Sequence, residues 1–437
     1  MKFTVSALGC KTNQYEMDAL AQKLCSYGMT PAIPGEQADL CVLNTCAVTG
    51  EAERKSRQLL RRFRRENPGA LIVACGCYSQ LDDLASLADL TAGTSRRDQL
   101  PELIFAALKG KTDLPANYIQ SLLSGAVYEE LGATAVPKET RAFLKIQDGC
   151  DNRCAYCAIC LARGPARSRS MEKIRGEAED LAGRGFSEIV LTGTNINAYG
   201  IDFKGGDQAV GLADVLDMLD KVDGIRRIRL GSLESGTITP RFMERVSGLR
   251  HLCPSFHLSL QSGSDRILKT MRRRDTSGKF RDAVERIRAC FPWAGITSDL
   301  IVGFPGETDH DFEETVAFCR EIGFLRIHVF RYSARPGTTA STMAGQVPEE
   351  LAALRSRILH GTASELAARA IKARMGQTRD VLVEQIDEKG RALGYTPEYI
   401  QVKGGPAGPQ TAVLQRGQIR AMRMTGLEGE TALAAIV

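Results

Sequence analysis

The sequence predicts an α/β protein of three parts: an amino-terminal parallel α/β domain, a central partial (β/α)6 barrel of the TIM type and a carboxy-terminal small β-barrel. Three observations support this prediction. At 437 residues, the chain is too long for one ordinary hydrophobic core. Strand-length apolar runs alternate with segments of helical period up to about residue 330, which is typical of parallel sheets covered by helices. Short apolar strands separated by Gly and Pro turns then follow. We therefore expect domains over residues 1–115, 136–372 and 373–437, with a connector of mixed composition before the second.

In the first domain, a cysteine follows each of three expected strands. The expected elements are strands over residues 2–8, 40–44 and 70–75 and helices over residues 13–27 and 51–65. The carboxyl ends of parallel strands meet in one crevice, so Cys10, Cys46 and Cys77 should lie together. A single cysteine there would be interpreted as an ordinary buried thiol. Three at the same topological position favour a metal cluster.

The helix expected over residues 51–65 is strongly basic, with few acids nearby. Such a run is usually a solvated face, but it can also bind nucleic-acid phosphates. The sequence alone leaves both interpretations open. The cations are Arg54, Lys55, Arg57, Arg61, Arg62, Arg64 and Arg65.

The central domain repeats a strand–helix unit six times, which predicts a barrel or part of one. Function in such barrels lies in the loops after the strands. The expected strands cover residues 143–147, 188–192, 227–231, 256–260, 297–302 and 325–330. The expected helices cover residues 171–184, 214–222, 240–246, 265–271, 280–289 and 311–322.

The loop after the first of these strands carries Cys150, Cys154 and Cys157 at C-x3-C-x2-C spacing. A closed [4Fe–4S] cluster needs four thiolates, so three leave one iron open to a small molecule. Zinc would usually require two separated C-x2-C pairs, and disulfides are not expected in a long chain without an export signal. Cys160 keeps another alternative open, because with the other three cysteines it could close a four-thiolate electron-transfer cluster.

Other polar groups stand at the ends of the later strands and could contact a ligand at the barrel mouth. Taken singly, each is better explained as a turn. Three arginines after the cysteine loop, Arg163, Arg167 and Arg169, could lie on the surface or contact substrate phosphate. The strand-end residues are Gly193, Thr194, Asn195, Ser232, Glu234, Gln261 and Gly303.

The tail predicts a small β-barrel, a shape that often binds RNA. Two tyrosines, at 395 and 399, could stack on bases, while nearby basic side chains contact phosphate. A capping module with incidental charge is the alternative. The basic residues are Lys403, Arg416, Arg420 and Arg423.

Motifs along nearly the whole chain resemble the methylthiotransferase family of radical S-adenosylmethionine (SAM) enzymes. LGCKTNQYE, NTCAVTGEAERKSRQ, CGCYSQ and DGCDNRCAYC carry the resemblance in the first two domains, and KTNQYE and AVTGEAERKSRQ are most similar to the MtaB branch. GTN, GSLES, SLQSGSD and DLIVGFPGET resemble the SAM-contacting motifs, and GYTPEYIQV resembles the TRAM domain. The sequence departs from the family at Cys160, where proline is usual.

The resemblance implies two [4Fe–4S] clusters, one on Cys150, Cys154 and Cys157 and the other on the cysteines of the first domain. Gly193 would face the SAM amino group and Glu234 its ribose, with the other strand-end residues nearby. No catalytic side chain is expected beyond the clusters, because the cofactor supplies the difficult step and the protein supplies position.

The implied reaction adds a methylthio group to carbon 2 of N6-threonylcarbamoyladenosine next to the anticodon of tRNA. A deoxyadenosyl radical from SAM would remove the hydrogen, the second cluster would deliver sulfur and a second SAM the methyl group. An external electron donor and a sulfur source are implied as partners. The alternatives are another tRNA base or protein target, or an iron–sulfur RNA-binding or electron-transfer protein.

Composition permits these partners without demanding them. The net charge is +5, which allows a nucleic-acid partner. No apolar run approaches the length of a membrane span, so no membrane partner is expected. Thirteen cysteines without an export signal predict a reducing compartment, and we expect a cytoplasmic protein.

Overall fold

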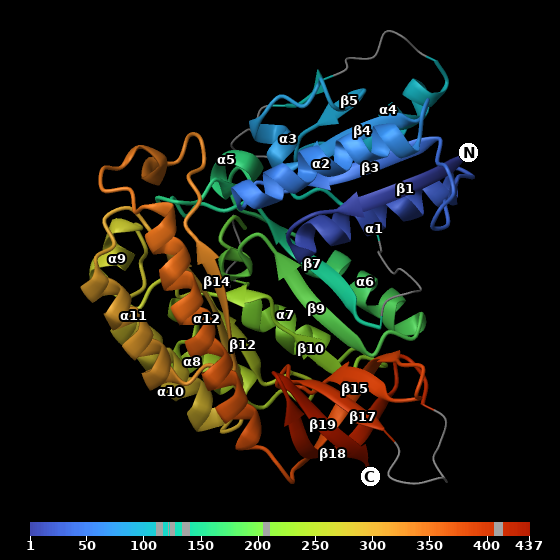
Figure 1. Ribbon diagram of the computed structural model, residues 1–437. Coiled ribbons are helices and arrows are strands. Elements are labelled where there is room, and N and C mark those ends of the chain that lie inside the picture. The colour runs from blue at the N-terminus through green and yellow to red at the C-terminus, as the bar shows by residue number, and fades with distance from the viewer. Residues whose placement is uncertain (111–116, 121, 123–126, 133–139, 204–209, 406–413) are drawn as a thin grey trace.

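The computed structural model describes residues 1–110, 117–120, 122, 127–132, 140–203, 210–405 and 414–437. Figure 1 shows three parts along the long axis of the molecule: the amino-terminal sheet at the top, the central barrel in the middle and a small β-barrel at the bottom. In the part of the chain that is described, no helix is long and apolar enough to cross a bilayer.

The amino-terminal part is a parallel sheet, as the strand–helix alternation predicts, and its strand order is β2-β1-β3-β4-β5-β6. β2, β5 and β6 are additional to the three predicted strands. β3 lies in the middle, and all six of its residues are buried. α2 packs on one face of the sheet, while α1 and α4 pack on the other. The strands are β1 (Lys2–Ala7), β2 (Thr30–Pro31), β3 (Leu40–Thr45), β4 (Leu71–Gly76), β5 (Leu90–Ala92) and β6 (Asn117–Tyr118). The helices are α1 (Lys11–Ser26), α2 (Gly50–Glu66), α3 (Cys77–Leu81) and α4 (Leu100–Leu108).

The central part is an open parallel barrel, whose strands follow one another in chain order. β7, β9 and β10 form one run, and β11, β12, β13 and β14 form the next. Only Leu230 and Gly231 separate β10 from β11, so one stretch of chain borders both runs. The strands are β7 (Ala142–Asp148), β9 (Glu188–Gly193), β10 (Arg227–Arg229), β11 (Ser232–Leu233), β12 (Ser255–Leu258), β13 (Gly295–Val302) and β14 (Arg326–Arg331). The short β8 (Arg167–Ser168) pairs antiparallel with β7, which the sequence did not predict.

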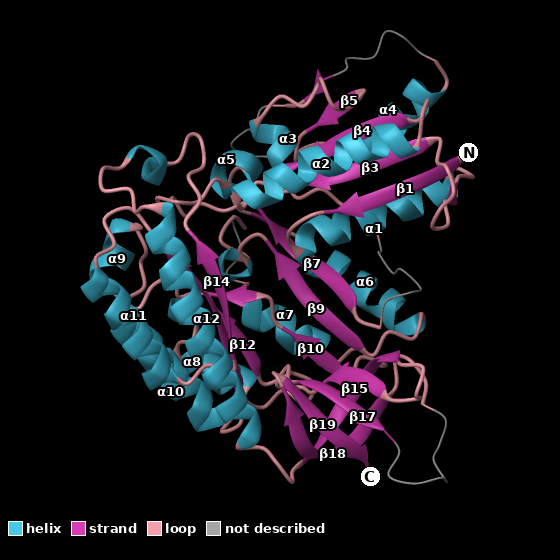
Figure 2. Cartoon of the chain, in the orientation of Figure 1, coloured by secondary structure: helices cyan, strands magenta, loops and turns pink. Residues whose placement is uncertain are grey.

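Helices cover the outside of this barrel, and their apolar faces pack on the strands in one large core (Figure 2). The α-helices are α5 (Ile159–Arg163), α6 (Met171–Gly183), α7 (Leu212–Leu219), α8 (Pro240–Val246), α9 (Asp265–Thr270), α10 (Ser277–Cys290), α11 (Asp309–Ile322) and α12 (Glu349–Lys372). Three single-turn helices are η1 (Ile196–Ala198), η2 (Ser235–Thr237) and η3 (Thr339–Thr342).

The tail forms a closed barrel of five strands in the order β15-β16-β17-β19-β18, which confirms the predicted small β-barrel. The strands are β15 (Thr378–Ile386), β16 (Ala392–Tyr395), β17 (Gln401–Gly405), β18 (Ile419–Glu428) and β19 (Thr431–Ile436).

The tail barrel docks on the central part where β7, β9 and β10 begin. The Arg227 side chain donates to the backbone carbonyl of Tyr395 at 3.1 Å. The rings of Tyr395 and Tyr399 stack with centroids 4.8 Å apart, and the guanidinium of Arg141 lies 5.2 Å from the first ring. The guanidinium of Arg229 lies 4.5 Å from the ring of Tyr399. The expectation that these tyrosines stack on RNA bases is therefore wrong, because arginines of the central part already pack against them.

Candidate active site

Three of the six candidate cluster cysteines follow a glycine with positive φ. The φ angles are +93° at Gly9, +99° at Gly76 and +73° at Gly149. A Cβ would lie 2.4 Å from the sulfur of Cys46 at Gly9, 2.0 Å from the side-chain oxygen of Asn44 at Gly76 and 1.9 Å from the carbonyl oxygen of Pro165 at Gly149. Only glycine fits these turns, and each turn sets the direction of the next cysteine.

Cys10, Cys46 and Cys77 come together at the carboxyl edge of the amino-terminal sheet. Each lies just past the carboxyl end of a strand, as predicted: Cys10 after β1, Cys46 after β3 and Cys77 after β4. Cys46 and Cys77 are each 3% exposed. Burial is the main cause that raises the pKa of Cys46 to about 12, and the nearby thiols of Cys77 and Cys10 contribute to this rise. Arg163, on α5 of the central part, donates from Nε to the sulfur of Cys77 at 3.2 Å.

Cys150, Cys154 and Cys157 lie on the loop between β7 and α5, at the mouth of the barrel. The Asn195 side-chain amide donates to the sulfur of Cys150 at 3.6 Å. Burial is the main cause that raises the pKa of Cys157 to about 12, and the other two thiols of the trio contribute to this rise. Cys160 also lies close, and its thiol donates to the carbonyl of Cys157 at 3.9 Å.

The donor sets fit iron–sulfur clusters better than single ions. A tetrahedral zinc ion with bonds of about 2.3 Å holds its sulfur ligands about 3.8 Å apart. Among the described residues, the sulfurs of neither trio all lie within 4.8 Å of one another. In a cubane, each cysteine binds a different iron, so a wider spacing is required. Thiols with a raised pKa are protonated at neutral pH, so a metal that binds them must displace the protons.

A cavity of about 160 Å³ lies between the loops that carry the two trios. Its lining comes from three places: residues 47–49 after Cys46, residues 156–159 around Cys157, and inner-face residues of β13 and β14 with the loops that follow β12 and β14. A second cavity of about 270 Å³ lies on the other side of the cysteine loop, with Glu234 and three arginines at 272–274 in its wall. One molecule in the first cavity would therefore face both cysteine loops.

Of the predicted SAM-contacting residues, Asn195, Glu234 and Gln261 lie at the cysteine loop. Asn195 contacts Cys150 as described, Glu234 accepts from the Asn152 side chain at 2.6 Å, and Gln261 lines the cavity between the loops.

The other four predicted residues make contacts within the chain or are exposed. Gly193 ends β9 against β7, the hydroxyl of Thr194 donates to Asp148 at 2.8 Å, and Ser232 is exposed on β11. Gly303 packs against α12, because a Cβ there would lie 2.7 Å from the Cβ of Ala352. Gly303 follows the carboxyl end of β13 directly, with its Cα turned toward α12.

A buried network of five charged side chains joins the amino-terminal sheet to the barrel. Arg163 donates at 2.9 Å to both Glu16 and Asp148. Lys145 contacts the same carboxylates at 2.9 and 2.7 Å, and Arg97 contacts Asp148 at 2.9 Å. Each is at most 5% exposed. The nearby cations hold the pKa of both carboxyl groups well below the usual range, despite burial.

Sequence reasoning missed this network. Both suggested roles for Arg163, Arg167 and Arg169 are wrong, because all three are buried in contacts within the chain. One signal was present: Lys145 stands in the middle of an apolar strand, where a lysine needs a buried carboxylate partner.

On the basic helix α2, five of the seven cations pair with acids. Arg57 instead donates to the hydroxyl of Tyr78. Arg61 is exposed. The paired residues are Arg54, Lys55, Arg62, Arg64 and Arg65.

Comparison with known proteins gives two family matches. Residues 144–319 match the radical SAM superfamily, and residues 2–93 match the uncharacterized protein family UPF0004. The chain is 34% identical to the threonylcarbamoyladenosine tRNA methylthiotransferase MtaB of Chlamydia pneumoniae, over 100% of this chain and 98% of the relative. It is 37% identical to MtaB of Bacillus subtilis, over 90% and 88%. It is also 36% identical to the tRNA-2-methylthio-N(6)-dimethylallyladenosine synthase of Pelotomaculum thermopropionicum, over 90% and 88%.

A solved structure shares the fold. The radical SAM methyltransferase TsrM of Kitasatospora setae, with tryptophan and a SAM analogue bound, superposes with a TM-score of 0.57 over 90% of this chain and 84% of TsrM, at 14% identity.

Proposed function

This chain belongs to the methylthiotransferase family of radical SAM enzymes, and on that premise we propose that it adds a methylthio group to carbon 2 of N6-threonylcarbamoyladenosine beside the anticodon of tRNA. When bound, SAM and two [4Fe–4S] clusters supply the radical and the sulfur for this reaction. Cys150, Cys154 and Cys157 would hold the cluster that meets SAM. Cys10, Cys46 and Cys77 would hold the other. An external electron donor and a sulfur source complete the proposal, which places the reaction in the cytoplasm with its tRNA.

The observation that carries this proposal is the cavity between the two cysteine loops. Carbon–hydrogen cleavage and sulfur insertion at one carbon require both centres to reach the same atom. Residues 47–49 follow directly after Cys46, and residues 156–159 include Cys157, so both loops wall one space of about 160 Å³. A base inserted there lies between the two centres.

The chain's own residues position these groups. Asn195 directs its amide at the sulfur of Cys150, and the backbone N–H of Asn195 is itself held by the Gln147 side chain at 2.7 Å. The Glu234 carboxylate accepts from Asn152 on the cysteine loop and has free lone pairs for ribose hydroxyls. These contacts support a SAM site at this loop, beside the second cavity.

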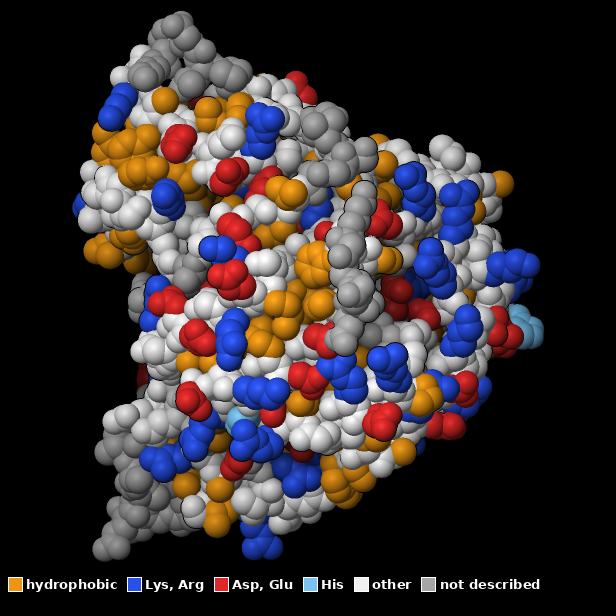
Figure 3. Space-filling view, turned by 180° about the vertical axis from the view of Figure 1, so that it is seen from behind, with side chains coloured by type: hydrophobic (Ala, Val, Ile, Leu, Met, Phe, Trp, Pro, Cys, Tyr) orange, Lys and Arg blue, Asp and Glu red, His pale blue; other side chains and the backbone are white. Residues whose placement is uncertain are grey.

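The basic helix α2 leads to the cavity, so tRNA phosphates can bind along it while the base enters the cavity. Thr49 lines the cavity and caps α2, accepting from the N–H of Ala52 at 3.1 Å. The exposed cations of α2 therefore begin at the cavity rim. On the face seen in Figure 3, Lys and Arg side chains are interspersed with Asp and Glu over the described surface. We propose that α2 binds phosphates of the anticodon stem-loop.

The choice of substrate rests on the relatives. Both the threonylcarbamoyladenosine and the dimethylallyladenosine enzymes match this chain at 34–37% identity, so identity alone does not separate them. The experiment is nucleoside mass spectrometry of tRNA from cells with and without the gene. We expect 2-methylthio-threonylcarbamoyladenosine to disappear with the gene, while the dimethylallyl derivative is unchanged. The opposite result would reassign the substrate.

A further inference from the structure

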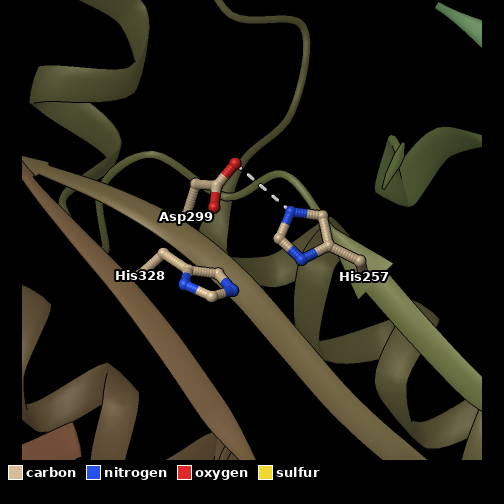
Figure 4. A group of neighbouring side chains, drawn as sticks. All are labelled: His257, Asp299 and His328. Atoms are coloured by element: carbon tan, nitrogen blue, oxygen red, sulfur yellow. Dashed lines mark ion pairs between the residues drawn. The ribbon is translucent and has the colours of Figure 1, made fainter. Parts of the chain in front are cut away.

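Three side chains from neighbouring strands meet on the inner face of the central barrel (Figure 4). They are His257 on β12, Asp299 on β13 and His328 on β14, and their nearest ligand atoms all lie within 4.8 Å of one another. Strand register explains the meeting, because β13 pairs Thr297 with His257 on one side and Asp299 with His328 on the other. Asp299 also lines the cavity between the cysteine loops.

The geometry already approaches that of a metal site. The Nε2 atom of His257 lies 3.2 Å from Oδ2 of Asp299. Two ligands of one tetrahedral ion with bonds of about 2.1 Å lie about 3.4 Å apart. The other ring nitrogen of His257, Nδ1, lies 2.9 Å from the hydroxyl of Thr297. Metal-binding histidines commonly have their second nitrogen fixed in this way, because it sets the ring orientation.

Two cations lie near the site, because Lys11 and Arg326 both interact electrostatically with His328. Their positive charges would favour an anionic group as the remaining ligand of an ion held here.

We propose that His257, Asp299 and His328 bind one divalent ion of the zinc class, which keeps an open coordination position for a carboxylate. Two imidazoles and one carboxylate form a donor set that this class of ion accepts, and three protein ligands leave room for a fourth. The carboxylate at the open position rests on the proposed function, because the threonylcarbamoyl group of that substrate carries a carboxylate. The six cysteines take no part in this site.

The first test uses the holoenzyme with both clusters in place. One equivalent of zinc is added anaerobically, free metal is removed by gel filtration, and zinc and iron are counted by mass spectrometry. We expect one zinc per chain, with nitrogen and oxygen neighbours at about 2.0–2.1 Å in X-ray absorption and no sulfur at about 2.3 Å. Sulfur neighbours, or no retained zinc, would overturn the proposal.

Variants locate the ion. His328→Ala and Asp299→Asn should each lose the zinc while keeping their iron, and the iron content shows that the chain remains folded. The matched control is His251→Gln, because His251 also lies beside a carboxylate, with Nδ1 3.3 Å from Asp220, but belongs to no group of three. It should keep its zinc. Equal retention of zinc by His328→Ala and by the wild type would overturn the proposed zinc site.

The second test addresses the carboxylate. For tRNA that bears threonylcarbamoyladenosine, the KM of the zinc-bound wild type should be at least tenfold lower than that of His328→Ala. The change in kcat should be smaller. The same KM in the wild type and in His328→Ala would overturn the proposed binding of the carboxylate. The zinc counts would still decide whether the metal site exists. No turnover by the wild type would refute the proposed function instead, and the zinc counts would still decide the site.

Discussion

The guanidinium of Arg163 lies 3.2 Å from the sulfur of Cys77, so the helix that follows one cysteine trio contacts the other trio. α5 begins two residues after Cys157, and its last residue reaches the edge of the amino-terminal sheet. The same side chain binds Glu16 and Asp148, which come from the two parts that it joins. One buried arginine therefore links the two candidate cluster sites directly.

Replacing Arg163 should destabilise the protein strongly. Arg163→Met removes a side chain that is 1% exposed and leaves two buried carboxylates with fewer partners. Breaking a buried ion pair in this way costs about 3–5 kcal/mol. Urea unfolding of the metal-free chain measures the effect. The control, Arg175→Met, breaks an exposed pair with Glu179 and should cost at most about 0.5 kcal/mol. Similar losses in both variants would contradict the assigned role of the network.

The glycines before the cysteines should be essential for cluster binding. Gly9→Ala would drive a methyl group into the sulfur of Cys46, and Gly149→Ala into the backbone of Pro165. Each variant should lose about half of the iron, because only one trio is displaced in each. Gly69→Ala is the matched control, because its φ is +87° but no atom lies within 4 Å of the added carbon. If it loses as much iron, backbone strain rather than cysteine placement is responsible.

Iron counts should separate the two trios and exclude Cys160 as a ligand. Anaerobically reconstituted protein should hold about eight irons per chain, and about four after replacement of either trio by alanine. Cys160→Ala should keep about eight irons and SAM cleavage, because its thiol contacts the carbonyl of Cys157 as an ordinary donor. Loss of four irons in Cys160→Ala would instead support a closed electron-transfer cluster.

The sequence predicted the positions of the main parallel strands because each of them is an apolar run bounded by turn residues. It also predicted where the cysteines meet, because parallel strands bring their carboxyl ends to one edge. β8 was missed, since two polar residues in an arginine-rich loop carry no strand pattern.

The contacts between the parts were harder to predict. Charged residues such as Glu16 and Arg163 look like surface residues when only local sequence is considered, and their partners lie 147 positions apart. The position of Gly303 against α12 depends on a helix that begins 46 residues later in the chain, at Glu349. Tyr395 and Tyr399 resemble base-stacking residues until the docking of the tail covers them.

Glu16 should make stability depend on pH in the acid range. Its carboxyl has a lower pKa in the folded chain than the value of about 4.3 expected when unfolded. Its contribution is therefore complete above about pH 4.3 and is lost as the pH falls below that value. The urea midpoint of the wild type should fall between pH 6 and 3 more steeply than that of Glu16→Gln. Glu179→Gln, at an exposed pair, should follow the wild type. Parallel curves for wild type and Glu16→Gln would show that folding does not lower the pKa of this carboxyl.

The basic helix should contribute to tRNA binding through Arg61. This side chain is exposed on α2, whereas five of the other cations already pair with acids of the same chain. Arg61→Glu replaces an attraction to phosphate by a repulsion, so affinity for tRNA should fall several-fold, and the dependence of log K on log salt should become shallower by about one unit. Filter binding or fluorescence anisotropy over a range of salt concentrations measures both quantities. Lys221→Glu makes the same change in net charge at an exposed residue between α7 and β10, and should leave the salt slope unchanged. If both variants lower the affinity equally, tRNA responds only to total charge, and the phosphate path along α2 is wrong.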